Sequence, residues 1–330
     1  MQRRYVMAID AGAEASQCAI ADFEGNVLAF TSAGPSESGA AGGLALKGSI
    51  RSATQAAIAS AGADLPQIDV VLAGAAGIGS DGEGAEELEA LLVELVPGAG
   101  RVRAIGDMVV AFWGALAMPV GVVVSADIGS VCYGRNVTGE TCQVGGWGPL
   151  LGDEGSAYDI ARGALRAVVR AADGRGRRTV LSELLMRALE ANSETEMAQR
   201  IYAQGNDREA VAALAVHVGA AARRRDAVAM RILQSAGRDL AIAVATTLRE
   251  LNLLETPTSV SYSGSVFESG RTIVEAFSTS VQEATSFAKV EAPLLPPIGG
   301  AYRLGLQMLG ITMDEPIIHR FAKGLVSRGL

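Results

Sequence analysis

Apolar and polar positions alternate along the first half of the chain in runs that predict strands and helices. Residues 6–30, VMAIDAGAEASQCAIADFEGNVLAF, read as an apolar strand, a turn of small residues and two more short strands. Farther on, four leucines share one face of residues 84–95, and Pro97 and Gly98 end that helix. The pattern of this half predicts strands over 4–10, 16–22, 26–30, 68–74 and 101–105, and helices over 44–61, 84–95 and 107–117.

The second half of the chain opens with the same order of elements. Residues 121–146, GVVVSADIGSVCYGRNVTGETCQVGG, again read as an apolar strand, a turn and two short strands. VMAIDAG from Val6 and VVSADIG from Val123 both run from apolar residues into Asp, one further residue and Gly, a short internal repeat at the head of each half. The remainder predicts helices over 154–172, 179–191, 194–203, 207–225, 227–252, 268–284 and 298–309, and strands over 258–264 and 287–291.

Composition and charge narrow the class of protein. A chain of 330 residues that is 49% hydrophobic is typical of one large or two closely packed α/β domains. The formal net charge of −8 gives no general attraction toward nucleic acid or an anionic membrane, and the longest apolar stretch is too short to span a bilayer. The basic groups DGRGRR and ARRRD lie on alanine-rich helices and their connections, where we expect solvated surface rather than anion sites.

The three cysteines indicate a reducing compartment. Cys18, Cys132 and Cys142 stand far apart, with no CxxC pair and no histidine at ligand spacing. This arrangement predicts neither a disulfide framework nor a zinc site. We therefore expect a cytoplasmic protein with no nucleic-acid partner and no membrane partner.

A glycine-rich tract carries the first candidate chemistry. It runs over residues 145–165, GGWGPLLGDEGSAYDIARGAL, and its glycines let the backbone approach a ligand closely. Asp153 and Glu154 stand before a predicted helix, and their carboxylates can accept hydrogen bonds from vicinal hydroxyls of a sugar. Plain capping of the helix is the alternative, since its dipole favours carboxylates there. Trp147 could stack on a sugar face or pack in a hinge.

This tract resembles the signature of the N-acetylglucosamine kinase family, which shares its fold with activator ATPases of the benzoyl-CoA reductase type within the sugar kinase/actin/heat-shock ATPase superfamily. The resemblance continues in order over most of the chain, through the first strand with its Asp and a Gly-containing turn, AGAAGIG at 73–79, AIGDMVVAFWGA at 104–115, DIGS at 127–130, SGSVFESG at 263–270 and PPIGGAYRLGL at 296–306. It implies an α/β fold of two actin-like, ribonuclease-H-like domains with an interdomain cleft that closes over ATP and a hexose. We expect residues 1–117 to form the first domain and residues 118–330 the second, with a helical insertion and a C-terminal helix that packs back on the first domain.

The resemblance also implies roles for individual residues. Asp107 falls at the position of the catalytic base, although it could instead cap the helix that follows it. Asp10 would organise Mg²⁺ through a carboxylate oxygen, the ligand that hard cations prefer. The expected nucleotide-binding residues are Asp10, Gly12, Ser16, Gly129, Ser130, Gly264 and Ser265. The expected substrate-binding residues are Ser38, Gly145, Gly146, Trp147, Asp153 and Glu154.

Three departures from the family pattern fall on the loops that would face the ligands. Glu14 occupies the first turn, where family members usually end a glycine-rich turn in Thr, so we consider Ser16 as the source of a hydroxyl. In the second turn Asp127 and Ile128 replace a Gly-Thr pair. Glu37 and Ser38 stand in the loop where family members place a sugar-contacting Asn. A glutamate beside a triphosphate brings like charges together, at a cost of ~1 kcal/mol in water and more in a partly buried site.

These observations predict an ATP- and Mg²⁺-dependent kinase that phosphorylates an amino sugar such as N-acetylglucosamine or glucosamine, and that forms a homodimer by resemblance. One alternative is a non-catalytic relative that binds a sugar or a partner and has a degenerate nucleotide site. A third interpretation, an activator ATPase, would need cysteines suited to an iron–sulfur cluster that bridges two subunits. Cys132 and Cys142 are expected in hairpin strands as small core residues, which disfavours that interpretation.

Overall fold

The computed structural model describes residues 4–12, 15–34, 43–62, 67–79, 82–203 and 207–330. The chain divides into two compact units, each built on a five-stranded sheet. The first unit holds Met1–Ala117 together with Pro293–Leu330, and the second holds Met118–Ala292. The sequence predicts a second domain over residues 118–330 whose C-terminal helix packs back on the first domain, and in the structure the segment Pro293–Leu330 belongs to the first unit.

The sheet of the first unit has the order β3-β2-β1-β4-β5. Its central strand β1 pairs antiparallel with β2 and parallel with β4, and β2 and β3 form a second antiparallel pair. Apart from its first residue, β4 is buried throughout, as expected for a parallel strand that is covered on both faces. The strands are β1 (Arg4–Ala11), β2 (Ser16–Asp22), β3 (Val27–Ala33), β4 (Gln67–Ala75) and β5 (Arg101–Gly106).

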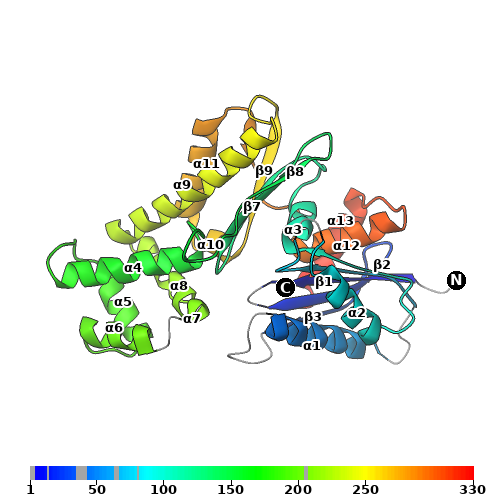
Figure 1. Ribbon diagram of the computed structural model, residues 1–330, viewed down its shortest axis with the longest axis horizontal. Coiled ribbons are helices and arrows are strands. Elements are labelled where there is room, and N and C mark those ends of the chain that lie inside the picture. Colours follow the sequence, from blue (N-terminus) through cyan, green and yellow to red (C-terminus); the bar gives the residue numbers. More distant parts are fainter. Residues whose placement is uncertain (1–3, 13–14, 35–42, 63–66, 80–81, 204–206) are drawn as a thin grey trace. The chain divides into compact units, whose positions relative to one another are not determined.

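Helices cover both faces of this sheet (Figure 1). Side chains of a strand alternate between faces, so Tyr5, Met7 and Ile9 of β1 lie in the core beneath α1 and α2. Val6 and Ala8 lie in the core that α12 and α13 cover. The helices of the unit are α1 (Gly43–Ala61), α2 (Ala85–Leu95), α3 (Asp107–Ala115), α12 (Pro297–Met308) and α13 (Glu315–Val326).

Helices α3 and α12 pack unusually closely through glycines. A Cβ atom on Gly300 of α12 would lie 1.9 Å from the carbonyl oxygen of Val110 in α3, and one on Gly114 of α3 would lie 2.6 Å from the carbonyl oxygen of Pro296. On the sheet side, a Cβ on Gly74 would come within 2.2 Å of Val110 Cγ2. Any side chain at these positions would push α3 away from α12 or from the sheet.

The C-terminal end of α3 is held by an arginine of α12. The guanidinium group of Arg303 donates hydrogen bonds to the carbonyl oxygens of Trp113, Leu116 and Ala117, at 3.1, 2.6 and 2.6 Å. A cation at this end satisfies carbonyls that have no partner within the helix and complements the helix dipole. Burial lowers the pKa of Arg303. Helix α3 is therefore fixed along its length and at its end.

The sheet of the second unit repeats the order of the first. Its strands run β10-β9-β6-β7-β8, so β6 occupies the central place that β1 has in the first unit. As in the first unit, β6 pairs antiparallel with the next strand and parallel with β9. The short repeat found at Val6 and Val123 therefore marks the central strand of each sheet. The strands are β6 (Gly121–Ala126), β7 (Ser130–Arg135), β8 (Thr141–Gly145), β9 (Thr258–Ser263) and β10 (Ala288–Val290).

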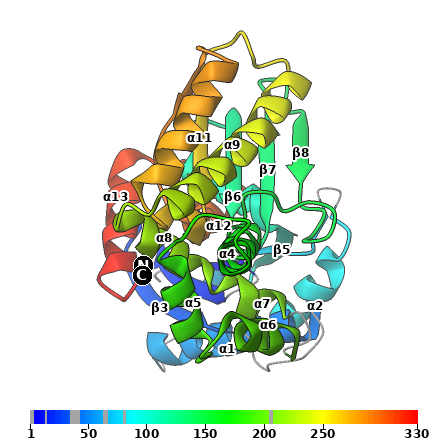
Figure 2. The ribbon, with the colours of Figure 1, turned by 90° about the vertical axis from the view of Figure 1, so that its left-hand side faces the viewer.

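Most of the second unit consists of helices around one core. Residues of β6, α4, α8, α9 and α11 share a single apolar cluster, and α9 and α11 lie side by side (Figures 1 and 2). A single helix is predicted over residues 207–225, but the structure has two shorter helices there, α7 and α8. The helices are α4 (Ala157–Ala172), α5 (Leu181–Ala188), α6 (Glu194–Ala203), α7 (Arg208–Ala212), α8 (Ala215–Arg223), α9 (Ala227–Glu250), α10 (Ser265–Glu268) and α11 (Arg271–Ala284).

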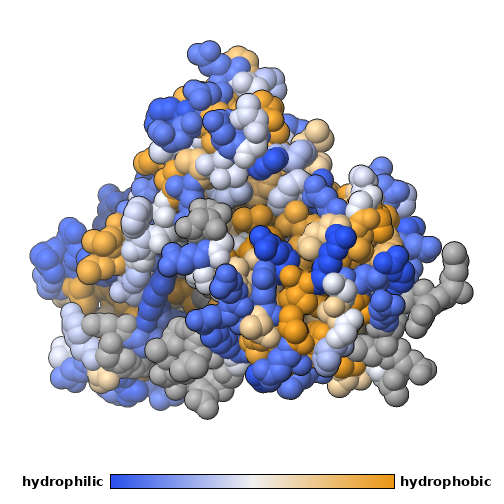
Figure 3. Space-filling view, turned by 45° about the vertical axis from the view of Figure 1, so that its right-hand side comes forward, coloured by the Kyte–Doolittle hydropathy of each residue, from blue (hydrophilic) through white to orange (hydrophobic). Residues whose placement is uncertain are grey.

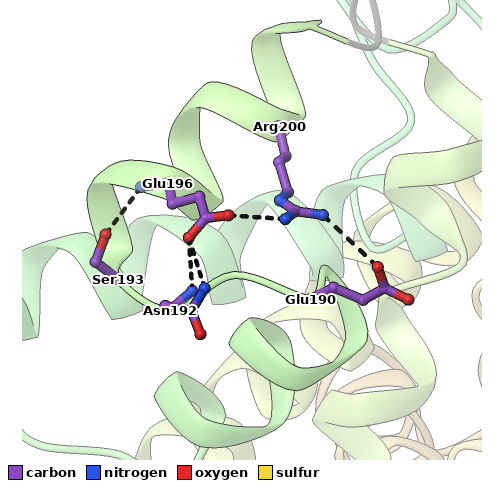
Figure 4. A network of polar contacts seen from close by, with 5 residues as sticks. All are labelled: Glu190, Asn192, Ser193, Glu196 and Arg200. Atoms are coloured by element: carbon purple, nitrogen blue, oxygen red, sulfur yellow. Dashed lines mark hydrogen bonds and ion pairs between the residues drawn. The ribbon is translucent and has the colours of Figure 1, made fainter.

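A polar network organises the connection from α5 into α6 (Figure 4). Glu196 accepts hydrogen bonds from the backbone and side-chain amides of Asn192 at 2.9 and 3.1 Å, while its own N–H donates to the Ser193 hydroxyl at 3.2 Å. Arg200 donates to the other oxygen of Glu196 at 2.7 Å and lies 3.8 Å from a carboxylate oxygen of Glu190. This arrangement is a variant of the capping box, and it fixes the start of α6.

The protection of the α6 amides against hydrogen exchange should depend on pH, because Glu196 titrates. The backbone hydrogen bond from Asn192, then Arg200 and the Asn192 side chain, lower the pKa of Glu196 from 4.5 to about 2. Because the pKa is lower in the folded state, the stabilisation is fully present above the ordinary pKa and is lost as pH falls toward about 2. We expect E196Q to reduce hydrogen-exchange protection of α6 amides at neutral pH, and the difference from wild type to vanish at low pH. E194Q, in the same helical turn, is the control, and an equal effect of both variants would contradict the assignment.

The exposed surface mixes polar and apolar residues. Hydrophilic residues cover much of the face in Figure 3, with hydrophobic residues between them. Among the most exposed large apolar side chains are Trp147, Leu150 and Leu151, which all belong to the glycine-rich tract. Within the described ranges, none of the helices combines the length and the apolar character needed to cross a membrane.

Candidate active site

Two carboxylates lie at the same edge of the first sheet. Asp10 stands near the end of β1 and pairs with Gly74 of β4, which in turn pairs with Ile105 of β5. Asp107 follows β5 directly as the first residue of α3. Neighbouring strands are about 4.8 Å apart, so Asp10 and the end of β5 are separated by roughly 10 Å. The carboxyl ends of parallel strands therefore bring together the predicted metal ligand and the predicted base.

Asp107 is held by the first turn of its own helix. Its Oδ1 accepts the backbone N–H of Met108 at 2.8 Å, and its side chain is half-buried. Gly106 is the residue that caps α3, in an extended conformation and with no side-chain cap. A carboxylate at this position benefits from the helix dipole, which favours negative charge at a helix N-terminus.

The first turn of the chain is described only in part. Glu14 lies outside the described residues, as does Ser38 in the loop after β3. Gly12 closes the described part of the turn, and its N–H donates to the carbonyl oxygen of Ala15 at 3.1 Å. Ser16 is fully buried, and its hydroxyl shares a 2.7 Å hydrogen bond with the hydroxyl of Ser49. A phosphate could bind Ser16 only if that hydrogen bond were exchanged.

The second turn, between β6 and β7, is bonded to two helix starts. The Oδ1 atom of Asp127 accepts the N–H of Ser265, the first residue of α10, at 2.6 Å. The backbone carbonyl oxygen of Asp127 accepts the N–H of Ala157, the first residue of α4, at 2.8 Å. Gly264 fits between these segments only without a side chain, because a Cβ would lie 2.3 Å from the carbonyl oxygen of Ala126. Asp127 therefore acts as a capping acceptor in this structure, and two predicted nucleotide segments, the second turn and Gly264–Ser265, meet the start of α4 around it.

Asp153 of the glycine-rich tract is buried and ion-paired. Its side chain is 3% exposed, and its Oδ2 lies 2.5 Å from a guanidinium nitrogen of Arg208. The other oxygen, Oδ1, accepts the N–H of Ser130 at 3.3 Å, and the Ser130 hydroxyl donates to the carbonyl oxygen of Glu154 at 2.8 Å. A Cβ on Gly129 would lie 2.5 Å from Arg208. The tract and the second turn are thus tied together through Asp153, with Arg208 as a partner that the sequence analysis did not identify.

Removing Arg208 should destabilise the second unit. In R208Q the Asp153 carboxylate would remain buried without a cation, and we expect the free energy of unfolding to fall by ~1–3 kcal/mol, less than for a fully buried pair because Arg208 is partly exposed. R162Q is a matched control, since Arg162 is 38% exposed and pairs with Asp159, which is itself 28% exposed. We expect less than ~1 kcal/mol from the control. Hydrogen exchange of peptides from α4 and β7 measures the loss of stability in each variant. Equal losses in R208Q and R162Q would mean that Asp153 needs no partner.

A pocket of about 380 Å³ adjoins the tract within the second unit. Its polar lining comes from Ser130, Glu154, Asp239 and Thr246, together with the backbone of Gly145, while the 74% exposed Trp147 forms part of its wall. Burial, then the nearby carboxylate of Asp159, raises the pKa of Asp239, and Glu154 adds to the effect. The pocket therefore combines an exposed aromatic ring with carboxyl groups, a combination suited to a sugar. Asp239 lies on α9, far from the tract in sequence, and no local motif marked it.

The cysteines are placed as structural residues. Cys18 and Cys132 are fully buried, and burial raises the pKa of each thiol to about 12. Cys142 is partly exposed, and burial also raises its pKa. A thiolate is the form that ligates metal, so these environments are unfavourable for a cluster. In the part of the chain that the structure describes, no group of three or more His, Cys, Asp or Glu side chains is placed to hold a metal ion.

The two repeated sheets and the carboxylates at the strand ends define the class of protein: a two-domain α/β protein with the fold of the actin-like sugar kinases. A solved putative N-acetylglucosamine kinase from Chromobacterium violaceum has this fold, with a TM-score of 0.69 and 22% identity over 91% of this chain and 98% of its own. So does a Streptomyces griseus glucokinase solved with glucose and AMPPNP, with a TM-score of 0.62 and 16% identity over 92% of this chain and 99% of its own. Residues 8–302 match the model of the BadF/BadG/BcrA/BcrD ATPase family, and the chain belongs to that family.

Two curated relatives carry kinase names. An N-acetylmuramic acid/N-acetylglucosamine kinase from Clostridium acetobutylicum is 27% identical over 274 residues, which are 83% of this chain and 89% of the relative. An N-acetyl-D-glucosamine kinase from Dictyostelium discoideum is 39% identical over 82 residues, which are 25% of this chain and 26% of the relative. The family resemblance and the fold predicted from the sequence are confirmed.

Proposed function

We propose that this protein transfers the γ-phosphoryl group of ATP to a hydroxyl group of an amino sugar of the N-acetylglucosamine class. The similarity to the Clostridium kinase, which extends over most of both chains, carries this proposal. The pocket beside Trp147 supports it, because an aromatic wall and carboxyl groups suit a sugar ring with several hydroxyls.

Asp107 is the proposed general base. In the reaction the sugar hydroxyl oxygen forms a bond to the γ-phosphorus, the bond from that phosphorus to the β–γ bridging oxygen breaks, and ADP leaves. Asp107 accepts the proton that the hydroxyl loses. Its place after β5, in the first turn of α3, fixes the carboxylate on a rigid element.

Asp10 is the proposed ligand for Mg²⁺, because it supplies a carboxylate oxygen at the end of β1 and Mg²⁺ is usually held by one or two carboxylates together with phosphates. The metal would neutralise charge on the phosphates. Gly12 and Gly129 are proposed to bring backbone close to the phosphates, and Gly264 with Ser265 to approach the adenosine. Ser130 is a weaker candidate for phosphate binding, because its N–H and hydroxyl are both bonded to the tract.

In the tract we propose that Gly145, Gly146, Trp147 and Glu154 contact the substrate. Asp153 has a different proposed task, since its carboxylate is committed to Arg208 and Ser130 and thereby shapes the loop. Ser38 remains a proposed sugar contact from the family resemblance. We propose a cytoplasmic location, because the proposed reaction uses ATP. We also propose a homodimer on the family resemblance, and sedimentation of the purified chain tests it.

A phosphotransfer assay tests the proposal. Purified protein is incubated with Mg·ATP and, separately, N-acetylglucosamine, glucosamine, N-acetylmuramic acid and glucose, and both ADP and sugar phosphate are quantified. We expect one sugar phosphate for each ADP with an amino sugar and much slower turnover with glucose. ADP without sugar phosphate would identify an ATPase instead.

In the alternative proposal the protein is a non-catalytic relative because Glu14 prevents nucleotide binding. Calorimetric titration with Mg·ATP distinguishes this alternative from the kinase. Binding by the native protein supports the kinase. Absence of binding, with recovery in E14T, would mean that Glu14 closes the nucleotide site and that the protein binds sugar without turnover.

A further inference from the structure

A second pocket in the second unit is lined by arginines. It has a volume of about 480 Å³ and lies between α4, the connection that follows α4, and the start of α9. Its arginines are Arg166, Arg170, Arg175, Arg177 and Arg231. Among the described residues that line it there is no aspartate or glutamate. A protein with a formal net charge of −8 thus gathers five of its cations around one hollow.

The pocket is formed by two facing helix surfaces. Arg166 and Arg170 lie one turn apart on α4, on the same side as Gly163, and Arg231 lies on the facing side of α9 beside Ile232. The helices are close at this point, since a Cβ on Gly163 would lie 3.5 Å from Ile232 Cγ2. Small and apolar residues therefore form the floor, and guanidinium groups stand around it.

The connection after α4 completes the wall. Gly176 packs against α4 so closely that a Cβ on it would lie 3.0 Å from Arg170 Cβ. Arg175 is oriented by Asp173, which accepts hydrogen bonds from its Nε at 2.9 Å and from a terminal nitrogen at 2.6 Å. Gly176 thus brings the connection against α4, and Arg175 and Arg177 on either side of it line the same pocket as the arginines of the helices.

We propose that this pocket binds a small molecule that carries a dianionic phosphate, either as a phosphate ester or as an oligophosphate. A planar guanidinium group matches phosphate oxygens with two parallel hydrogen bonds, which makes arginine the preferred residue for this recognition. The volume falls in the range of roughly 300–1,000 Å³ of small-molecule sites, and the floor gives room for the body of the molecule. A long polyanion is a poorer fit, because it needs a broad basic surface and this chain is acidic overall.

The site is distinct from the pocket beside Trp147. The two pockets use different parts of α9, with Val228–Ser235 lining the arginine pocket and Asp239–Thr246 lining the other. The inference therefore does not depend on the proposed kinase activity.

Calorimetric titration of the intact protein with inorganic pyrophosphate, at fixed ionic strength, tests the proposal. The pocket variant is R166Q/R170Q/R231Q, and the matched control is R223Q/R224Q/R225Q, which removes the same number of positive charges from the other basic stretch. We expect the pocket variant to lose at least ~10-fold in affinity and the control to stay within ~2-fold of wild type. Pyrophosphate should also raise the unfolding temperature of wild type and control, and not that of the pocket variant.

Two results of these titrations would overturn the proposal. Equal losses in the two variants would mean diffuse electrostatic attraction, and unchanged affinity in the pocket variant would place the pyrophosphate elsewhere, for example in a nucleotide site; either result overturns the proposal. Parallel titrations with inorganic phosphate and glucosamine 6-phosphate identify the source of the phosphate group, because a phosphate ester that binds more tightly than either inorganic ion would show that the floor contributes.

Discussion

Replacing Asp107 by Asn should lower kcat for sugar phosphorylation ~10²–10⁴-fold while leaving the dissociation constants for Mg·ATP and for the sugar within a few-fold of wild type. The amide keeps the shape of the carboxyl group and can still accept the Met108 N–H, so α3 should begin at the same residue. What it loses is the ability to take the proton of the attacking hydroxyl. The loss therefore falls on the chemical step, which single-turnover measurements with pre-bound substrates isolate.

D22N is the matched control for this prediction. Asp22 stands in the same unit, as the last residue of β2, where its carboxylate accepts the N–H groups of Glu24 and Asn26 in the turn that follows. An asparagine can accept the same bonds, and the site is remote from the end of β5. We expect kcat within ~2-fold of wild type in D22N. Comparable losses in the two variants, or full activity in D107N, would remove Asp107 from its proposed role.

The second large effect is expected from a single methyl group at Gly300. G300A would place a Cβ 1.9 Å from the carbonyl oxygen of Val110, in the backbone of α3, which cannot yield as a side chain does. We expect the first unit to lose ~2–4 kcal/mol of unfolding free energy. Because α3 starts with Asp107, its displacement should lower kcat as well.

Fluorescence can follow this unit by itself. The chain has two tryptophans, Trp113 in α3 and Trp147 in the second unit, so urea unfolding in a W147F background reports on the first unit. G163A is the control, a helix-interior glycine with ordinary room for a Cβ, where we expect a gain of about 0.5–1 kcal/mol in the second unit and no change in the Trp113 transition. A G300A protein as stable as wild type would show that α3 and α12 are less tightly packed than described.

Strand positions could be predicted closely because apolar alternation and turn residues are local signals. The strand expected over 4–10 is β1 at Arg4–Ala11, and the repeat at Val6 and Val123 marks the central strands of two sheets of the same order. The division of 207–225 into α7 and α8 could not be predicted, since the break at Ala213 and Leu214 contains neither Gly nor Pro to mark it.

Helix α13 was missed although the sequence carried its signals. Asp314 accepts the N–H of Ile317 at 3.0 Å as an N-cap, a proline follows in the first turn, and Ile317, Phe321 and Leu325 share the buried face. The helices predicted from the sequence end at residue 309, so α13 is not among them although its cap, its proline and its apolar spacing are local signals.

Some residues of the candidate site could likewise be predicted from local sequence signals, and others could not. Asp10 and Asp107 could be placed because each follows a predicted strand, and strand ends meet at one edge. Arg208 could not, since it is 55 residues from Asp153 and only the packing of α7 beside α4 brings it there. The sequence predicts solvated surface for the basic stretch DGRGRR, and residues 173–178 are exposed. Sequence spacing does not reveal that this connection also turns back onto α4, where Gly176 packs against Arg170.

The discontinuity of the first unit has a consequence for biosynthesis. Its sheet comes from the beginning of the chain, but α12 and α13, which cover Val6, Ala8 and Leu72, come from the end. While a ribosome is still translating, that apolar face lacks the cover of these two helices, and the continuous second unit is complete before α12 emerges. The unit that is started first is thus finished last, and a nascent chain halted before Pro297 would present an open sheet face to chaperones.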